Sequence, residues 1–115
     1  VNLETRQLTY EATLDLLDRH PDLKGIYVAG GGMEGAIAAL RERHPEPKIA
    51  LIVNEMTAES RAALIDGHAT MVIATPLPEL CNALVDMMIA AIGQAEDGVS
   101  GQYFLEPRLH LPEIL

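Results

Sequence analysis

The sequence contains few of the residues that build redox, disulfide or aromatic sites. Among its 115 residues there is no Trp, aromatic residues make up only 3%, and Cys81 is the single cysteine. One cysteine excludes a disulfide framework and a Cys-based metal site. Cys81 stands beside Leu80 and Leu84, so we expect its thiol to be buried. The core must be built from Leu, Ile, Val, Ala and Met, a composition that suits helices packed on a sheet.

Basic residues are also scarce. Lys and Arg number 8 against 17 Asp and Glu, so the formal net charge is −9. Such a chain is repelled by phosphate backbones and anionic membranes, and we expect neither a nucleic-acid surface nor a membrane partner. There is no signal peptide, and Asn82 and Asp86 interrupt the longest apolar run, residues 81–92. The sequence starts at Val1 without an initiating Met, which leaves open a leader or a domain upstream.

Short apolar runs alternate with amphipathic segments along the chain. The apolar runs predict buried strands and the amphipathic segments predict helices. Expected strands cover residues 24–29, 48–53 and 70–74, and expected helices cover residues 10–20, 33–44, 58–66 and 79–92. Residues 1–4 are typical of a strand end, 94–102 of a loop, and 103–112 of an edge strand or a connector. The order predicts an α/β fold with right-handed βαβ units, a mainly parallel sheet and helices on both faces.

In a parallel sheet the loops that follow the strands meet at one edge, here residues 5–7, 30–33, 54–57 and 75–78. Gly30, Gly32 and Gly35 fit the G-x-G-x-x-G pattern of a dinucleotide-binding turn, and Glu55 stands where a ribose-binding acid is expected. Two observations argue against a dinucleotide-binding enzyme. A strand and a helix precede the turn, and no later segment supplies a catalytic acid, base or nucleophile. A third interpretation is that the glycines only let a tight turn pack against its neighbours.

Several segments in order resemble the effector-binding domain of LacI/GalR-type transcription regulators and the related periplasmic sugar-binding proteins. They are His20-Pro21-Asp22-Leu23-Lys24-Gly25-Ile26-Tyr27-Val28, residues 51–57, residues 63–67 and residues 71–74. The resemblance runs from about Asp15 to Thr75, and residues 105–107 resemble the closing segment. Such domains clamp a sugar or other small polar effector between two α/β lobes. Residues 1–115 suffice for a single lobe and match the C-terminal one, which places the N-terminal lobe and any DNA-binding headpiece outside this chain.

The resemblance implies a set of effector-binding residues. The acidic ligand of the family corresponds to Glu55, with Asn54 beside it, and a carboxylate can accept hydrogen bonds from two vicinal hydroxyls. A solvated loop acid is the alternative for Glu55. Thr75 stands where the family commonly has Gln.

Three further residues complete this set. Gly31 and Gly32 occupy the place of a family Asn-Asp pair, a departure that removes two side-chain contacts, although backbone N–H groups at the helix start could still donate. Arg6, near the end of the opening strand, could face the same cleft or lie on the surface. The four histidines are scattered at helix ends and loops, so we expect no metal site and no cofactor.

The resemblance implies the effector-sensing and dimerisation portion of a cytoplasmic, sugar-responsive transcription regulator that performs no chemistry. It would bind operator DNA only through an N-terminal headpiece. A homodimer is expected, because the apolar stripes of the 33–44 and 79–92 helices, with Leu109, Leu111, Ile114 and Leu115, could leave a surplus patch. The alternatives are a periplasmic sugar-binding protein of an ABC transporter and, less favoured, a fragment of an NAD-binding enzyme.

Overall fold

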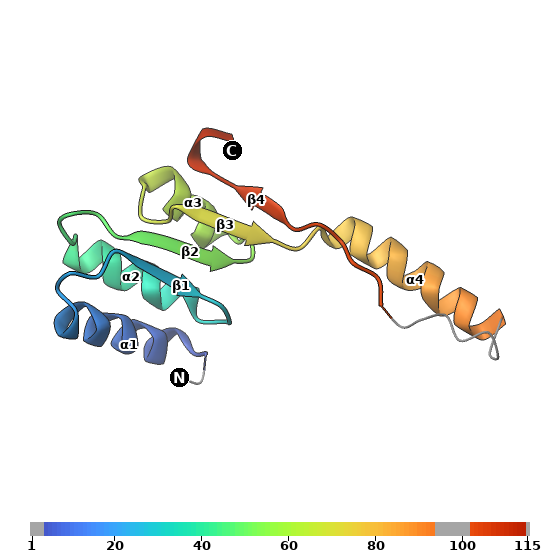
Figure 1. The fold of residues 1–115 in the computed structure, drawn as a ribbon, viewed down its shortest axis with the longest axis horizontal. Coiled ribbons are helices and arrows are strands. Elements are labelled where there is room, and N and C mark those ends of the chain that lie inside the picture. Colours follow the sequence, from blue (N-terminus) through green and yellow to red (C-terminus); the bar gives the residue numbers. More distant parts are fainter. Residues whose placement is uncertain (1–3, 94–101, 115) are drawn as a thin grey trace. The chain divides into compact units, whose positions relative to one another are not determined.

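The fold is known from a computed structural model, which describes residues 4–93 and 102–114. Helices and strands alternate as expected, and Figure 1 labels them in chain order. The elements are α1 (Arg6–Arg19), β1 (Gly25–Val28), α2 (Met33–Arg43), β2 (Ala50–Asn54), α3 (Ala58–Asp66), β3 (Met71–Ala74), α4 (Leu77–Gly93), β4 (Arg108–His110) and the 3-10 helix η1 (Pro112–Ile114). The strand expected at residues 1–4 and most of the loop expected at 94–102 lie outside the described residues.

The four strands form one sheet in the order β1-β2-β3-β4. β1 pairs with β2 in parallel, with Val28 opposite Val53, and β2 pairs with β3 in parallel, with Asn54 opposite Ile73. β4 lies beside β3 and runs in the opposite direction (Figure 1). The tail of the chain thus supplies an edge strand at Arg108–His110, as expected. The α/β class with a mainly parallel sheet is therefore confirmed.

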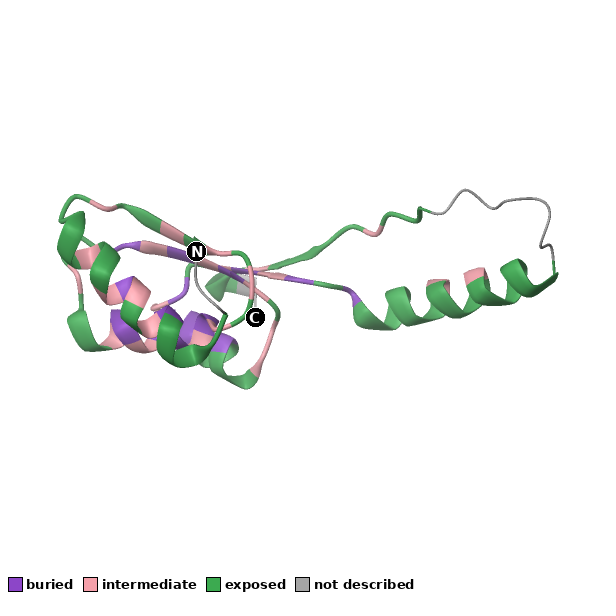
Figure 2. Cartoon of the chain, turned by 90° about the horizontal axis from the view of Figure 1, so that it is seen from below, coloured by how far each residue is buried: buried purple, intermediate pink, exposed green. Residues whose placement is uncertain are grey.

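The core lies between the sheet and the helices α1, α2 and α3, which share one face of the sheet (Figure 2). Helices on both faces were expected, but β1, β2 and β3 follow one another in sheet order, so right-handed crossovers keep the helices of residues 4–74 on a single face. Strand side chains alternate, so Leu51 and Val53 point into this core and are fully buried, whereas Ile52 is half-buried. Ile37 of α2 and Leu64 of α3 belong to the same buried cluster. No aromatic ring belongs to this cluster, in agreement with the composition.

Local signals set the bounds of α3. The Thr57 hydroxyl accepts a hydrogen bond from the Ser60 N–H, and the Ser60 hydroxyl accepts one from the Thr57 N–H, which makes a capping box. The helix ends at Gly67, whose φ of 84° suits glycine. The expected helix, residues 58–66, is confirmed at both ends.

The chain divides into two compact units, each described here by itself. The first comprises Val1–Ala74 with Leu109–Leu115, and the second comprises Thr75–Arg108. Helix α4 of the second unit starts two residues earlier than expected, because Pro78 fits in a first helical turn, where no N–H donor is needed. None of its residues is buried, and Cys81 is exposed, so the expectation of a buried thiol is wrong.

Candidate functional site

The carboxyl ends of β1 and β2 meet at one edge of the sheet, as the parallel pairing requires. Helices α2 and α3 begin at this same edge, each a few residues after the strand that precedes it (Figure 1). The turns at residues 29–32 and 55–57 therefore lie side by side. In open α/β sheets this edge is where small molecules bind.

Glu55 follows β2 directly and has an unusual backbone conformation. Its φ is 73°, in the left-handed region that is costly for a residue with a Cβ. The conformation is held from both sides, because the Glu55 N–H donates to the Ile73 carbonyl at 2.9 Å and its carbonyl accepts from the Ser60 hydroxyl at 3.0 Å. The Glu55 side chain is exposed. A strained backbone that presents an exposed carboxylate at a binding edge is typical of a functional residue.

Asn54, next to Glu55, links the ends of two strands. Its amide group donates to the Ala29 carbonyl at 2.6 Å, and its amide oxygen accepts from the Tyr27 hydroxyl at 3.2 Å. These bonds hold the turn after β1 against the end of β2. Asn54 therefore supports the edge, and its predicted contact with an effector stays a prediction.

The glycine turn receives the start of α1. A Cβ at Gly30 would overlap the Glu4 carboxylate, and one at Gly32 would lie 2.7 Å from the Thr5 carbonyl oxygen. Gly35, inside α2, would place a Cβ 2.6 Å from the Tyr10 nitrogen and would overlap the Arg6 carbonyl. The glycines that fit a dinucleotide pattern thus let α1 approach this turn and α2 closely, which agrees with the interpretation that they serve packing.

Gly31 and Gly32 occupy this turn as the sequence places them, with Gly31 exposed and Gly32 at the N-cap of α2 with a φ of 84°. The N-cap glycine supplies no side-chain hydrogen bond, so backbone N–H groups of the first helical turn face the edge. Such groups can donate to a hydroxyl or an anion.

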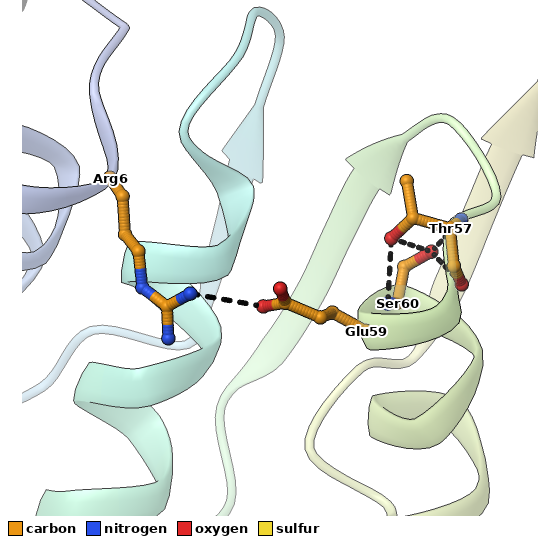
Figure 3. A network of polar contacts seen from close by, with 4 residues as sticks. All are labelled: Arg6, Thr57, Glu59 and Ser60. Atoms are coloured by element: carbon orange, nitrogen blue, oxygen red, sulfur yellow. Dashed lines mark hydrogen bonds and ion pairs between the residues drawn. The ribbon is translucent and has the colours of Figure 1, made fainter.

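Arg6 is the first residue of α1 rather than the end of a strand. Its guanidinium pairs with Glu59 of α3 at 3.5 Å, and both side chains are at least half exposed (Figure 3). Thr75 follows β3 directly and is exposed, but it belongs to the second unit. The structure thus brings Gly31, Gly32 and Glu55 to one edge of the sheet. Asn54 stands next to Glu55 and supports this edge.

Glu4 is the residue at this edge that the sequence did not point to. It is exposed, its carboxylate lies against Gly30, and its φ is 58°. A cavity of about 380 Å³ is lined by Glu4, by β1 with the turn after it, and by one side of α1. The only sequence signal was the run of three glycines, which indicates space for a neighbouring segment.

Other cavities lie at the opposite, amino-terminal ends of the strands. One of about 630 Å³ is formed by residues near 17–24 and 43–49, and another of about 290 Å³ is lined by His44, Lys48 and His68. The His44 and His68 ring centroids are 5.6 Å apart. Burial lowers the pKa of His68, and the neighbouring Arg41 and His44 lower it further. These histidines lie near the ends of α2 and α3, away from the candidate edge.

In residues 4–93 and 102–114, no three His, Cys, Asp or Glu side chains are grouped so that they could hold a metal ion. Within the same ranges, no helix has both the length and the apolar character needed to cross a membrane.

The fold and its carboxyl edge define a small-molecule-binding α/β lobe. A family model described as "Periplasmic binding protein domain" matches residues 1–96, and the chain belongs to this family. Because it is a family of binding proteins, the prediction that the chain is not an enzyme is confirmed. No curated protein matches the sequence.

Solved structures of similar fold include several sugar-binding proteins. GanP, a glucose-galactose binding protein from Geobacillus stearothermophilus, has 23% identity and a TM-score of 0.83 over 96% of this chain and 39% of its own. A periplasmic ribose ABC transporter protein from Conexibacter woesei has 22% identity and a TM-score of 0.78 over 97% and 38%. A periplasmic solute binding protein from Actinobacillus succinogenes with bound D-allose has 15% identity and a TM-score of 0.79 over 96% and 38%. The chain thus spans less than half the length of these proteins.

Proposed function

We propose that this chain forms one wall of the ligand cleft of a two-lobe binding protein, and that the ligand is a sugar or a similar polyhydroxylated molecule. The observation that carries the proposal is the exposed Glu55 carboxylate, held in a left-handed backbone conformation where β2 ends. A carboxylate accepts hydrogen bonds from vicinal hydroxyls, and this one has no catalytic partner in the described turns.

The similar solved structures support a sugar as the ligand, since their titles name glucose, galactose, ribose and D-allose. This chain covers 38% to 39% of those proteins, so the opposite wall would come from a second lobe. The mechanism is closure of the two lobes on the ligand, which shifts the population from an open to a closed state.

The test is calorimetric titration of the full-length protein with D-glucose, D-galactose, D-ribose and D-allose. The Glu55→Gln variant keeps the size of the side chain and removes its charge. We expect it to weaken binding by about 1 to 3 kcal/mol, the value of a hydrogen bond to a charged group. An equal affinity of the two proteins would remove Glu55 from the site, and failure of every sugar to bind would refute the proposed function.

A transport protein and a regulator are both compatible with this cleft. The sugar-binding neighbours favour a periplasmic solute-binding protein of an ABC transporter. The ordered resemblance from Asp15 to Thr75 favours the effector-sensing part of a LacI/GalR-type regulator, which would be a cytoplasmic homodimer that binds operator DNA through a separate headpiece. A secretion signal encoded upstream of Val1 would support transport, and a helix-turn-helix would support regulation.

The dinucleotide interpretation has a simple test as well. Gly32 and Gly35 closely approach α1, so we expect no saturable fluorescence change when the full-length protein is titrated with NADH. Saturable binding that disappears in Glu55→Ala would reverse this conclusion.

A further inference from the structure

The side chain of Tyr27 lies on the face of the sheet opposite α1, α2 and α3. Tyr27 pairs with Ile52, whereas Leu51 and Val53 point to the other face, into the buried core. Tyr27 is 56% exposed, so packing alone does not select one orientation of its ring. A hydrogen bond does so, because the Tyr27 hydroxyl donates to the amide oxygen of Asn54 at 3.2 Å.

The neighbours of Asn54 fix the direction in which its amide group points. The Ala29 carbonyl can only accept a hydrogen bond, so the Asn54 nitrogen must face it, at 2.6 Å. The amide oxygen then faces the Tyr27 hydroxyl, which supplies the proton. Rotation of the amide by 180° would set two oxygens against each other at Ala29. Without the Tyr27 hydroxyl, the amide would keep only one of these two anchors.

The bond to Ala29 acts on the turn at the carboxyl edge of the sheet. Ala29 precedes three successive glycines, residues 30–32, and glycine has the largest backbone freedom of any residue. A peptide group is planar, so fixing the direction of the Ala29 carbonyl also fixes that of the Gly30 N–H. Asn54 is followed directly by Glu55, whose backbone is bound on both sides. The Asn54 side chain therefore joins the glycine turn to the end of β2.

We propose that Tyr27 is a positioning residue for ligand binding: its hydroxyl fixes the Asn54 amide, which in turn holds residues 29–32 in the conformation that binds the ligand. The proposal rests on the proposed function, because it assumes that this edge binds a sugar. When only a fraction of the free protein has the binding conformation, the apparent Kd rises in inverse proportion to that fraction. A turn that is held in place before the ligand arrives therefore binds more tightly.

The test is calorimetric titration of the full-length Tyr27→Phe protein with the tightest-binding of D-glucose, D-galactose, D-ribose and D-allose. This variant removes the hydroxyl and keeps the ring. We expect the Kd to rise about three- to tenfold, as the loss of one hydrogen bond predicts. A role in the fold alone would lower the free energy of unfolding and leave the Kd of the folded protein unchanged. Both quantities are therefore measured, with the Kd taken well below the unfolding temperature.

Tyr10→Phe is the matched control. The Tyr10 hydroxyl of α1 donates to the Glu42 carboxylate near the end of α2, so this variant also removes one tyrosine hydroxyl bond. The carboxyl edge lies at the start of α2, and we expect Tyr10→Phe to leave the Kd unchanged.

A double-mutant cycle measures whether Tyr27 acts through Asn54. Asn54→Leu removes both amide bonds and keeps the size of the side chain. In that background Tyr27→Phe should not raise the Kd further, because the bond it removes is already absent. A further rise as large as that in the wild type would mean that Tyr27 acts independently of Asn54, and would overturn the inference.

The outcomes separate this inference from the proposed function. If wild-type protein binds a sugar and Tyr27→Phe binds it equally well, Tyr27 has no positioning role, while the function stands. If Tyr10→Phe raises the Kd as much as Tyr27→Phe does, the effect is not specific to the edge and the inference fails. If no sugar binds to the wild type, the proposed function fails and this inference falls with it.

Discussion

At the scale of single residues, Glu55 illustrates a trade-off between the stability of the fold and ligand binding. Glycine would adopt the φ of 73° at little cost, whereas a side chain there is strained by about 1 kcal/mol or more. The strain is enforced by the Glu55 backbone bonds to Ile73 and Ser60. Glutamate at this position therefore costs stability that glycine would not, as is found where a strained residue serves a ligand site.

We therefore predict that Glu55→Gly raises the free energy of unfolding of the full-length protein by about 1 kcal/mol and reduces sugar binding. Chemical denaturation measures the first effect and calorimetry the second. Glu55→Gln is the control, because it loses the charge but keeps the strain. A Glu55→Gly protein less stable than wild type would show that this side chain serves the fold.

A second residue-scale prediction concerns His68. Burial lowers its pKa in the folded protein, the positive charges of Arg41, His44 and Lys48 lower it further, and Asp66 opposes them. The unfolded chain therefore takes up this proton at a higher pH than the folded chain does. The folded state thus favours neutral His68. Its contribution to the free energy of unfolding is complete above the unfolded-state pKa of about 6.5 and is lost as the pH falls below that value.

Denaturation curves between pH 8 and pH 5 measure this effect. We expect the decrease in unfolding free energy toward pH 5 to be smaller in His68→Gln than in the wild type. His20→Gln serves as the control, since His20 is exposed at the end of α1. If His68→Gln keeps the full pH dependence, other groups cause it.

At the scale of elements, α1 and α2 are joined by a close approach at Gly35 and by one ion pair. Arg43 of α2 pairs with Asp18 of α1 at 2.7 Å, and its hydrogen bonds lower the pKa of the Asp18 carboxyl. Both side chains are exposed, so this pair adds orientation more than stability. The close approach at Gly35 decides the packing, because the Arg6 carbonyl and the Tyr10 nitrogen would meet any Cβ there.

Gly35→Ala should destabilise the protein by about 1 to 3 kcal/mol. Alanine favours a helix by about 1 kcal/mol over glycine, so propensity alone predicts the opposite sign. Thermal or chemical denaturation measures the change. Gly93→Ala, at the end of α4, is the control, because a Cβ there has no described neighbour within 4 Å. A stabilised Gly35→Ala protein would contradict the close packing.

At the scale of the whole molecule, the proposed function assigns this chain one wall of a cleft. Residues 1–96 match the family model, yet the chain covers under half of the length of the similar solved structures. A ligand held on one side keeps much of its surface in water and makes only part of its hydrogen bonds. In the proposed two-lobe protein we therefore expect affinity to depend on the second lobe.

We predict that the isolated 115-residue chain binds D-glucose, D-galactose, D-ribose and D-allose weakly or not at all. Calorimetry at millimolar sugar should give no saturable heat, while the full-length protein should saturate. Micromolar binding by the isolated chain would show that this lobe carries a complete site.

Much of the fold could be predicted from the sequence because its signals are local. Thr57 and Gly67 mark both ends of α3 through backbone hydrogen bonding and a left-handed C-cap, so that helix was predicted with its observed bounds. Arg6 was misplaced on a strand, because its helix starts with Thr5 as N-cap. Cys81 was misjudged because an apolar sequence neighbourhood does not determine burial in the folded unit.

By itself, the sequence determined the alternation of strands and helices, the parallel sheet and the edge at which Glu55 lies, since periodicity, caps and the right-handed βαβ rule act over short distances. Only the tertiary structure decided what the glycines do. Gly30 and Gly35 face segments about 25 residues away in the chain, and a close approach between distant segments leaves no periodic trace in sequence. The same glycines fit a cofactor pattern in sequence, and in the folded chain they seat α1 and Glu4.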